Sequence, residues 1–119
     1  METILAKQTK TTPEIVFNNI DNKLTIKGNS FPIESELFWS MIIHQVKNFD
    51  QVDVVEIDLE YINTNSIVYI FKIIELTSSI INWVYEEYDE DMYDLGKMIK
   101  TLSKNKFNFM TKFEFEFDN

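Results

Sequence analysis

The segment Val52-Asp-Val-Val-Glu-Ile-Asp-Leu-Glu-Tyr-Ile-Asn-Thr-Asn-Ser66 contains a transition from a strand pattern to a helix pattern, and it is the most informative part of the chain for the fold. Apolar side chains alternate with charged ones over residues 52–59, which is the period of a β-strand with one buried face. Short amide and hydroxyl residues follow, and an apolar stretch over residues 66–80 then predicts a helix. We therefore expect a rigid strand that leads directly into a helix, with Thr64 in the turn between them.

The segments before this transition predict a β-hairpin and a helix. Residues 14–18 and 23–27 flank a turn-forming cluster, Asn18-Asn-Ile-Asp-Asn22, so they should pair as antiparallel strands. Residues 33–49 show the helical period, and their apolar stripe is formed by Leu37, Phe38, Met41, Ile42, Val46 and Phe49. Residues 1–11 are polar and without a pattern, which predicts a flexible tail.

The segments after the transition add a strand, a helix and a closing strand. Residues 81–85 predict a short strand, and residues 90–103 predict a helix with Met92, Leu95, Ile99 and Leu102 on its inward face. An alternating aromatic segment predicts a closing strand that contains Phe107, Phe109, Phe113, Phe115 and Phe117. The order ββαβαβαβ predicts a single α/β domain over residues 12–119, with a mixed, largely parallel sheet, an N-terminal hairpin and three helices.

Composition argues against several classes of function. The chain has 119 residues, of which 45% are hydrophobic, and this is enough for one buried core. It has no cysteine, which excludes disulfides and cysteine catalysis, and no arginine, which argues against nucleic-acid binding. No glycine-rich loop indicates a nucleotide cofactor, so we expect none. No apolar run or leader indicates a membrane span or export, so we expect a cytoplasmic protein.

The negative charge is concentrated in one part of the chain. The net charge is −9, and residues 50–94 contain twelve acidic residues against the single base Lys72. The loops at residues 60–65 and 86–91 would follow two parallel strands, so together with Asp58 they would form an acidic rim around Thr64. Such loops are often no more than a solvated surface. A metal site formed by Asp58, Glu60, Asp89 and Asp91 is a further alternative, although the chain lacks the EF-hand pattern.

Thr64 stands where a phosphate could be added. A phosphate at the start of a helix meets free N–H groups and the positive end of the helix dipole, which stabilises it by roughly 0.3–2 kcal/mol. Each nearby carboxylate would oppose it by on the order of 1–4 kcal/mol. We therefore expect a phosphate on Thr64 to act as a repulsive gate, because a partner pocket that fits a hydroxyl would have to desolvate the phosphate.

The helix after Thr64 has more apolar residues than one buried face needs. Tyr69, Ile73 and Leu76 fall outside the predicted core face and would form a docking strip for a partner, unless neighbouring segments cover them. Elsewhere, His44 is expected on the surface, and Trp39 and Trp83 are expected in the core or at its boundary.

Four sequence motifs are distributed along the chain: Thr12-Pro-Glu-Ile-Val-Phe, Leu24-Thr-Ile-Lys-Gly-Asn-Ser-Phe-Pro, Tyr61-Ile-Asn-Thr-Asn-Ser and Asn82-Trp-Val-Tyr-Glu-Glu-Tyr-Asp-Glu-Asp-Met. In order and spacing they resemble the motifs of the bacterial SiaC-type regulatory phosphoproteins. The resemblance covers the chain from Thr12 to about Phe113. The third and fourth motifs are uncommon, and their joint occurrence at this spacing is fairly specific.

The resemblance implies a fold like that of the STAS-type anti-sigma-factor antagonists. It also implies a threonine, here Thr64 with Ser66 as a fallback, that a serine/threonine kinase phosphorylates and a metal-dependent phosphatase dephosphorylates. In this family the unmodified form binds and activates a diguanylate cyclase, which links it to cyclic-di-GMP and biofilm control. The residues expected to contact partners are Tyr61, Asn63, Asn65, Tyr69, Ile73, Leu76, Glu86, Glu87, Asp89, Glu90 and Asp91.

Three functions remain open at this level. The favoured one is a non-enzymatic signalling switch that other proteins phosphorylate on Thr64. The second is an acidic adaptor that binds a lysine- and arginine-rich protein without any phosphorylation. The third is a small metal-dependent enzyme that uses the acidic rim.

Overall fold

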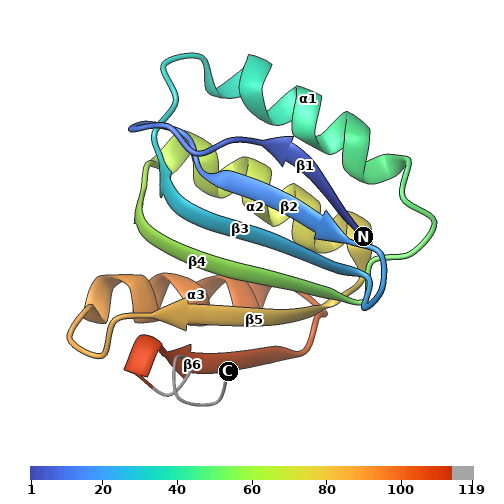
Figure 1. Cartoon of the computed structure of the whole chain (residues 1–119). Coiled ribbons are helices and arrows are strands. Elements are labelled where there is room, and N and C mark those ends of the chain that lie inside the picture. The colour runs from blue at the N-terminus through green and yellow to red at the C-terminus, as the bar shows by residue number, and fades with distance from the viewer. Residues whose placement is uncertain (114–119) are drawn as a thin grey trace.

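One mixed sheet and three helices make up the protein in the computed structural model, which describes residues 1–113 (Figure 1). The strands are β1 (Glu2–Ala6), β2 (Glu14–Asn18), β3 (Lys23–Ser30), β4 (Val54–Ile62), β5 (Ile80–Tyr85) and β6 (Phe107–Thr111). The helices are α1 (Ser35–Lys47), α2 (Thr64–Thr77) and α3 (Glu90–Leu102). Among the described residues, no helix has the length and hydrophobicity needed to cross a membrane.

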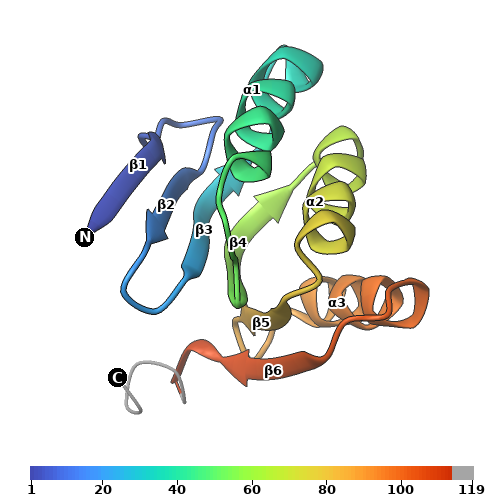
Figure 2. The same cartoon turned by 90° about the vertical axis from the view of Figure 1, so that its right-hand side faces the viewer.

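The strands follow one another across the sheet in chain order. β1, β2 and β3 pair antiparallel, whereas β3, β4, β5 and β6 pair parallel, and one helix connects each parallel pair. Because the order advances in one direction, right-handed crossovers place every connecting helix on the same face of the sheet. Figure 2 shows α1, α2 and α3 on that side. The carboxyl ends of the parallel strands and the starts of the three helices therefore meet along one edge.

The core lies between the sheet and the helices. The register aligns Leu24, Val55, Ile81 and Phe107 across four parallel strands, and all four side chains are buried. Trp39 from α1 and Trp83 from β5 are fully buried, as the sequence predicts. Side chains that alternate with the core row point to the opposite side of the sheet, which we call the open face. Its central residues are Glu56 and Asp58 of β4.

The predicted element order is confirmed, with one strand more than the sequence indicates. Residues 2–6 belong to the predicted tail but form β1, which pairs with β2 and begins where Asn19 N donates to Met1 O at 3.1 Å. An edge strand pairs on one side only and can carry polar side chains on both faces, so its pattern in the sequence is weak. The tail prediction is therefore wrong for these five residues.

Three apolar residues predicted to face the core are exposed. Leu37 and Met41 of α1 and Leu102 of α3 have exposed fractions of 59%, 60% and 65%. α1 uses a narrower buried face, formed by Ser35, Trp39, Ile42 and Val46. The closing strand is also shorter than predicted: β6 ends at Thr111, Phe113 lies beyond it, and Phe115 and Phe117 lie outside the described residues.

Candidate functional site

Thr64 is the first residue of α2 and stands directly after the residue that caps the helix. Asn63 has an extended backbone (φ −86°, ψ 165°), and its side-chain oxygen accepts a hydrogen bond from Ser66 N at 2.9 Å. Asn63 N in turn donates to Ser30 O at 2.9 Å, which ties the cap to the end of β3. Asparagine is among the best helix caps because its short side chain reaches the free N–H groups of the first turn. The cap therefore comes from the residue directly before Thr64.

The Thr64 side chain is exposed and has no hydrogen-bond partner among residues 1–113. It stands at the carboxyl end of β4, on a turn whose backbone is held by the cap. A kinase must bring the acceptor hydroxyl in line with the phosphoryl group it transfers, so an exposed hydroxyl on a rigid turn is a suitable substrate. The geometry around Thr64 therefore allows phosphorylation without unfolding.

Ser66 is two residues further along but lies in a different environment. It is fully buried, and its Oγ accepts hydrogen bonds from Ser30 Oγ at 2.8 Å and from Trp39 Nε1 at 3.3 Å. These contacts join β3, α1 and α2 beneath the Thr64 turn. A kinase could reach this hydroxyl only after the first turn of α2 had opened, so the folded structure argues against the fallback acceptor. Its role here is to hold the turn in place.

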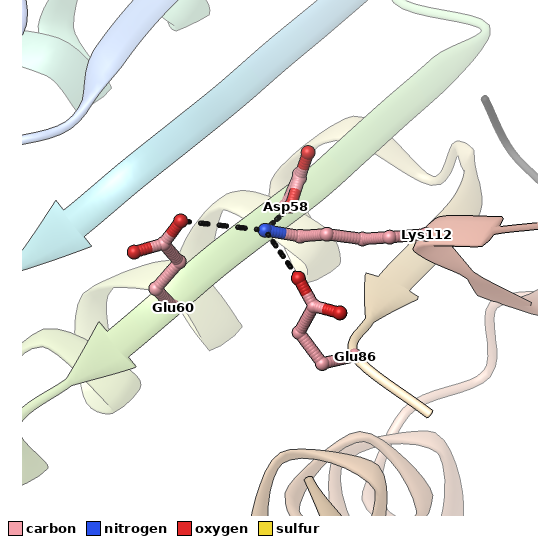
Figure 3. Close-up of polar contacts among 4 residues, drawn as sticks. All are labelled: Asp58, Glu60, Glu86 and Lys112. Atoms are coloured by element: carbon pink, nitrogen blue, oxygen red, sulfur yellow. Dashed lines mark hydrogen bonds and ion pairs between the residues drawn. The ribbon is translucent and has the colours of Figure 1, made fainter. Parts of the chain in front are cut away.

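Three carboxylates of the predicted acidic rim gather around one lysine on the open face (Figure 3). Lys112 follows β6, and its Nζ lies 3.5 Å from an oxygen of each of Asp58, Glu60 and Glu86. The side chain of Asp58 is only 7% exposed, and that of Lys112 is 17% exposed. We call these four residues the Lys112 cluster. The sequence predicts that the three acids surround Thr64, whereas they converge on Lys112, because residues 58 and 60 alternate to the face opposite the helices.

The Lys112 ammonium is retained at high pH. Burial lowers the pKa of Lys112, but the carboxylates of Asp58, Glu60 and Glu86 together outweigh this effect, so the pKa lies above its ordinary value of 10.5. Sequence reasoning missed this residue. The register of β5 and β6 brings it into place: Tyr85 pairs with Thr111, so the next residues, Glu86 and Lys112, are neighbours. The sequence carries no signal of this pairing.

Residues of the two predicted acidic loops line one cleft between the carboxyl end of β4 and the start of α3. Glu60 and Tyr61 at the end of β4 line a cleft of about 370 Å³ together with Asp89 and Asp91 at the start of α3. The apolar floor of this cleft is formed by Ile62, Met92 and Leu95. Asp89 also caps α3 by accepting a hydrogen bond from Met92 N at 3.1 Å. The two predicted acidic loops are therefore neighbours, because β4 and β5 are adjacent in the sheet.

A larger groove runs between α1 and α2 on the other side of the Thr64 turn. It has a volume of about 780 Å³, and we call it the α1–α2 groove. Its lining residues are Glu34, Ser35, Glu36, Leu37 and Ser40 from the start of α1, and Asn65, Val68 and Tyr69 from α2. Because Asn65 is one of them, the groove ends next to Thr64.

Comparison with known proteins assigns the family. The model of the SiaC family of regulatory phosphoproteins matches residues 6–112. The chain belongs to the SiaC family. A comparison with curated proteins found no match.

Solved structures of SiaC from Pseudomonas aeruginosa share the fold of this SiaC-family chain. The one described as SiaC of Pseudomonas aeruginosa has a TM-score of 0.80 at 21% identity, covering 92% of this chain and 98% of that chain. The apo-SiaC crystal structure gives 0.75 at 21% identity, with 91% and 98% covered. A chain in the crystal structure of the diguanylate cyclase SiaD in complex with its activator SiaC gives 0.78 at 22% identity, with 87% and 95% covered.

The residues predicted to contact partners fall into three groups in this SiaC-family fold. Tyr61, Asn65, Leu76, Glu87, Glu90 and Asp91 are exposed, and Asn63, Tyr69, Glu86 and Asp89 are half-buried. Ile73 is fully buried, so the predicted docking strip is wrong at this position. α1 packs against α2, so part of the additional apolar surface of α2 is covered by α1. Two exposed residues were missed: Val68, and Phe31, which stacks edge-to-face on Tyr61 at 5.3 Å.

The residues of the predicted metal site are not arranged for a metal. Asp58 and Glu60 face Lys112, whereas Asp89 is engaged as the cap of α3. Within residues 1–113, no group of three or more His, Asp or Glu side chains is placed to bind a metal ion. His44 lies exposed on α1.

Proposed function

We propose that this SiaC-family protein is a non-enzymatic signalling switch that is phosphorylated on Thr64. The observation that carries the proposal is the contrast between two hydroxyls in one turn: Thr64 is exposed on a capped helix start, whereas Ser66 is fully buried and hydrogen-bonded. A partner kinase adds the phosphate, and a metal-dependent serine/threonine phosphatase removes it. The protein itself holds the Thr64 hydroxyl in a fixed and exposed position at the capped start of α2.

The unmodified protein binds and activates a diguanylate cyclase in this proposal. The support is that SiaC of Pseudomonas aeruginosa is described as the activator of the diguanylate cyclase SiaD in their complex. This chain shares that fold over most of its length, and it belongs to the same family. The output would be a change in cyclic-di-GMP synthesis, with the cyclase and not this chain carrying out the chemistry.

The phosphate acts by making the surface around Thr64 unusable. At the start of α2, the helix dipole favours a phosphate by roughly 0.3–2 kcal/mol. The cleft at the carboxyl end of β4 and the start of α3 holds Asp89 and Asp91, and their negative charge would oppose the phosphate. A partner that packs over a threonine hydroxyl would have to desolvate a phosphate there, and an unpaired buried charge costs far more than the dipole returns. Binding is therefore lost without any large change in the fold.

The direct test is phosphorylation by a serine/threonine kinase encoded beside the gene. Purified protein is incubated with the kinase and ATP, and the intact mass and the modified peptide are measured. We expect one phosphate on Thr64 in the wild type and in Thr64→Ser, and none in Thr64→Val, which keeps the shape but removes the hydroxyl. Asn65→Ala is the matched control and should accept one phosphate.

Binding of the cyclase encoded in the same genome then tests the gate. The unmodified protein and Thr64→Val should bind it, and the phosphorylated protein should bind at least about tenfold more weakly. Equal binding of both forms would contradict the gate. If no phosphate is found on Thr64 in protein isolated from its native cell, the unmodified acidic adaptor becomes the better description.

A further inference from the structure

β4 and β5 separate toward their carboxyl ends. Within residues 1–113, the ladder between these two strands ends at the pair Asp58 and Val84. β4 continues beside β3 as far as Ile62, and β5 continues beside β6 as far as Tyr85. In Figure 1 the two ribbons lie close together at their starts and move apart toward their arrowheads. The sheet is therefore split between β4 and β5, at the edge where the helices begin.

A β-bulge explains why β4 turns away from β5. Gly28 of β3 pairs with Leu59 of β4, but the next residue of β3, Asn29, pairs with Tyr61. Glu60 is thus the extra residue of the bulge. Gly28 has a φ of 122°, a conformation that glycine adopts readily. Because a bulge bends its strand and redirects the side chains beside it, this one turns the end of β4 away from β5.

The Lys112 cluster lies across this split (Figure 3). Asp58 and Glu60 belong to β4, Glu86 follows β5 and Lys112 follows β6, so the lysine reaches over β5 to β4. Glu60 lines the cleft on the helix side and also a small hollow of about 80 Å³ on the open face. It therefore stands between the two hollows, and its ion pair with Lys112 closes the split on the open face.

Without the ammonium group, the three carboxylates of the cluster would repel one another. Each has an oxygen 3.5 Å from Lys112 Nζ, so no two of these oxygens are more than about 7 Å apart. Solvent screens such a repulsion poorly around Asp58, which is buried. Asp58 is fixed within the ladder, whereas Glu60 and Glu86 lie beyond it and have side chains that are 66% and 39% exposed. Repulsion would therefore move the ends of β4 and β5 apart.

We propose that Lys112 is a clasp that holds the carboxyl ends of β4 and β5 together and so positions residues 86–91. This loop connects β5 to α3 and carries Asp89, which lines the cleft. With the clasp closed, the end of β4 and the start of α3 keep a fixed separation. With the clasp open, the loop moves while the ladder between β4 and β5 remains. The clasp does not require a phosphate on Thr64, so it goes beyond the proposed function.

The first measurement is the distance across the split, obtained by pulsed electron paramagnetic resonance. The chain has no cysteine, so spin labels attach only where cysteines are introduced. Asn65→Cys on α2 and Glu90→Cys on α3 place the two labels at exposed positions on either side of the cleft. In this doubly labelled background we expect one narrow distance distribution. Adding Lys112→Met should lengthen the mean distance and broaden the distribution about twofold, because a loop without its anchor samples more positions.

Hydrogen exchange of the backbone amides distinguishes a clasp from a lysine that merely stabilises the fold. In Lys112→Met and in Glu86→Ala, the amides of residues 86–91 should exchange about tenfold faster or more, while the β4–β5 ladder changes much less than the loop. Glu86→Ala releases the loop without leaving Asp58 unpaired, so it also serves if Lys112→Met fails to fold. Glu87→Ala removes the neighbouring exposed acid and should leave the loop unchanged.

Several results would overturn the proposal. They are an unchanged distance and unchanged loop exchange in both Lys112→Met and Glu86→Ala, equal effects of Glu86→Ala and Glu87→Ala, and equal acceleration in the loop and the ladder. All measurements use the unphosphorylated protein. Failure of the clasp would therefore leave phosphorylation of Thr64 standing, and absence of that phosphate would leave the clasp standing.

Discussion

Ser30 Oγ donates a hydrogen bond to Ser66 Oγ at 2.8 Å, and this contact joins the end of β3 to the first turn of α2. Trp39 Nε1 donates to the same oxygen at 3.3 Å, so α1 is joined to the turn as well. All three side chains are fully buried. The turn that presents Thr64 is therefore supported from beneath by groups that cannot exchange their partners for water.

Ser66→Ala should destabilise the fold by about 1–3 kcal/mol, because it leaves two buried donors without an acceptor. Urea unfolding followed by circular dichroism measures the change. Ser40→Ala, at an exposed position of α1, is the control and should change the free energy of unfolding by no more than about 0.5 kcal/mol. Ser66→Ala should still be phosphorylated on Thr64. Loss of that phosphate in a folded variant would indicate that Ser66 is the acceptor.

Asn63→Ala should lower the free energy of unfolding by about 1 kcal/mol, because it removes the side chain that accepts a hydrogen bond from Ser66 N. Asn63→Asp retains a capping oxygen and should cost much less. Asn65→Ala lies one residue inside α2 and should be neutral or slightly stabilising, since alanine favours helices. Equal losses in Asn63→Ala and Asn63→Asp would contradict the assignment of the cap.

Gly96→Ala should destabilise the protein although the substitution lies within a helix. A Cβ at this position would lie 2.6 Å from Trp83 Nε1 and 2.7 Å from its Cδ1, where the indole donates to Met92 O at 3.0 Å. In an open helix the same change stabilises by about 1 kcal/mol, whereas overpacking a core costs about 1–3 kcal/mol. Thermal unfolding and near-ultraviolet circular dichroism decide the sign, and a rise in melting temperature would show that α3 can move away.

Lys112→Met should destabilise the fold by about 1–3 kcal/mol at neutral pH, because it leaves the buried Asp58 carboxylate without its cation. Lys106→Met is the control at an exposed position, with an expected change within about 0.5 kcal/mol.

The difference in free energy of unfolding between wild type and Lys112→Met should depend on pH, because the pKa of Lys112 is raised in the folded protein. A raised folded-state pKa means that the contribution is complete below the unfolded value of 10.5 and is lost as the pH rises through the folded value. The gap between wild type and Lys112→Met should therefore be constant from pH 6 to about pH 9 and narrow above about pH 10.5. A gap that shrinks between pH 6 and pH 9 would contradict this origin.

The element order and the place of Thr64 follow from local patterns in the sequence. Alternation at Val55, Ile57 and Leu59 predicts a strand with one apolar face, and these three side chains are buried. The change from alternating to helical period after Ile62 predicts a helix that begins at Ser66, and α2 begins two residues earlier, at Thr64. Such patterns are local, because side chains alternate between the two faces of a strand and repeat about every 3.6 residues along a helix.

Long-range pairing decided which of the candidate residues face one another. Leu37 is exposed and Ile73 is buried, the reverse of the pattern-based expectation. Which face of each helix is covered depends on how α1 and α2 pack on each other and on the sheet. Asp58, Glu60 and Glu86 meet Lys112 because their strands are adjacent, although up to 54 positions separate them in the chain. No periodicity within one element carries that information.

The sequence by itself thus determined the elements from β2 to β6, the acidic character and the threonine at the start of α2. Only the tertiary structure decided that Thr64 is exposed while Ser66 is buried, and that a groove opens beside one of them. The physical reason is that burial depends on which surfaces the crossover helices bring together, and strand order sets those surfaces.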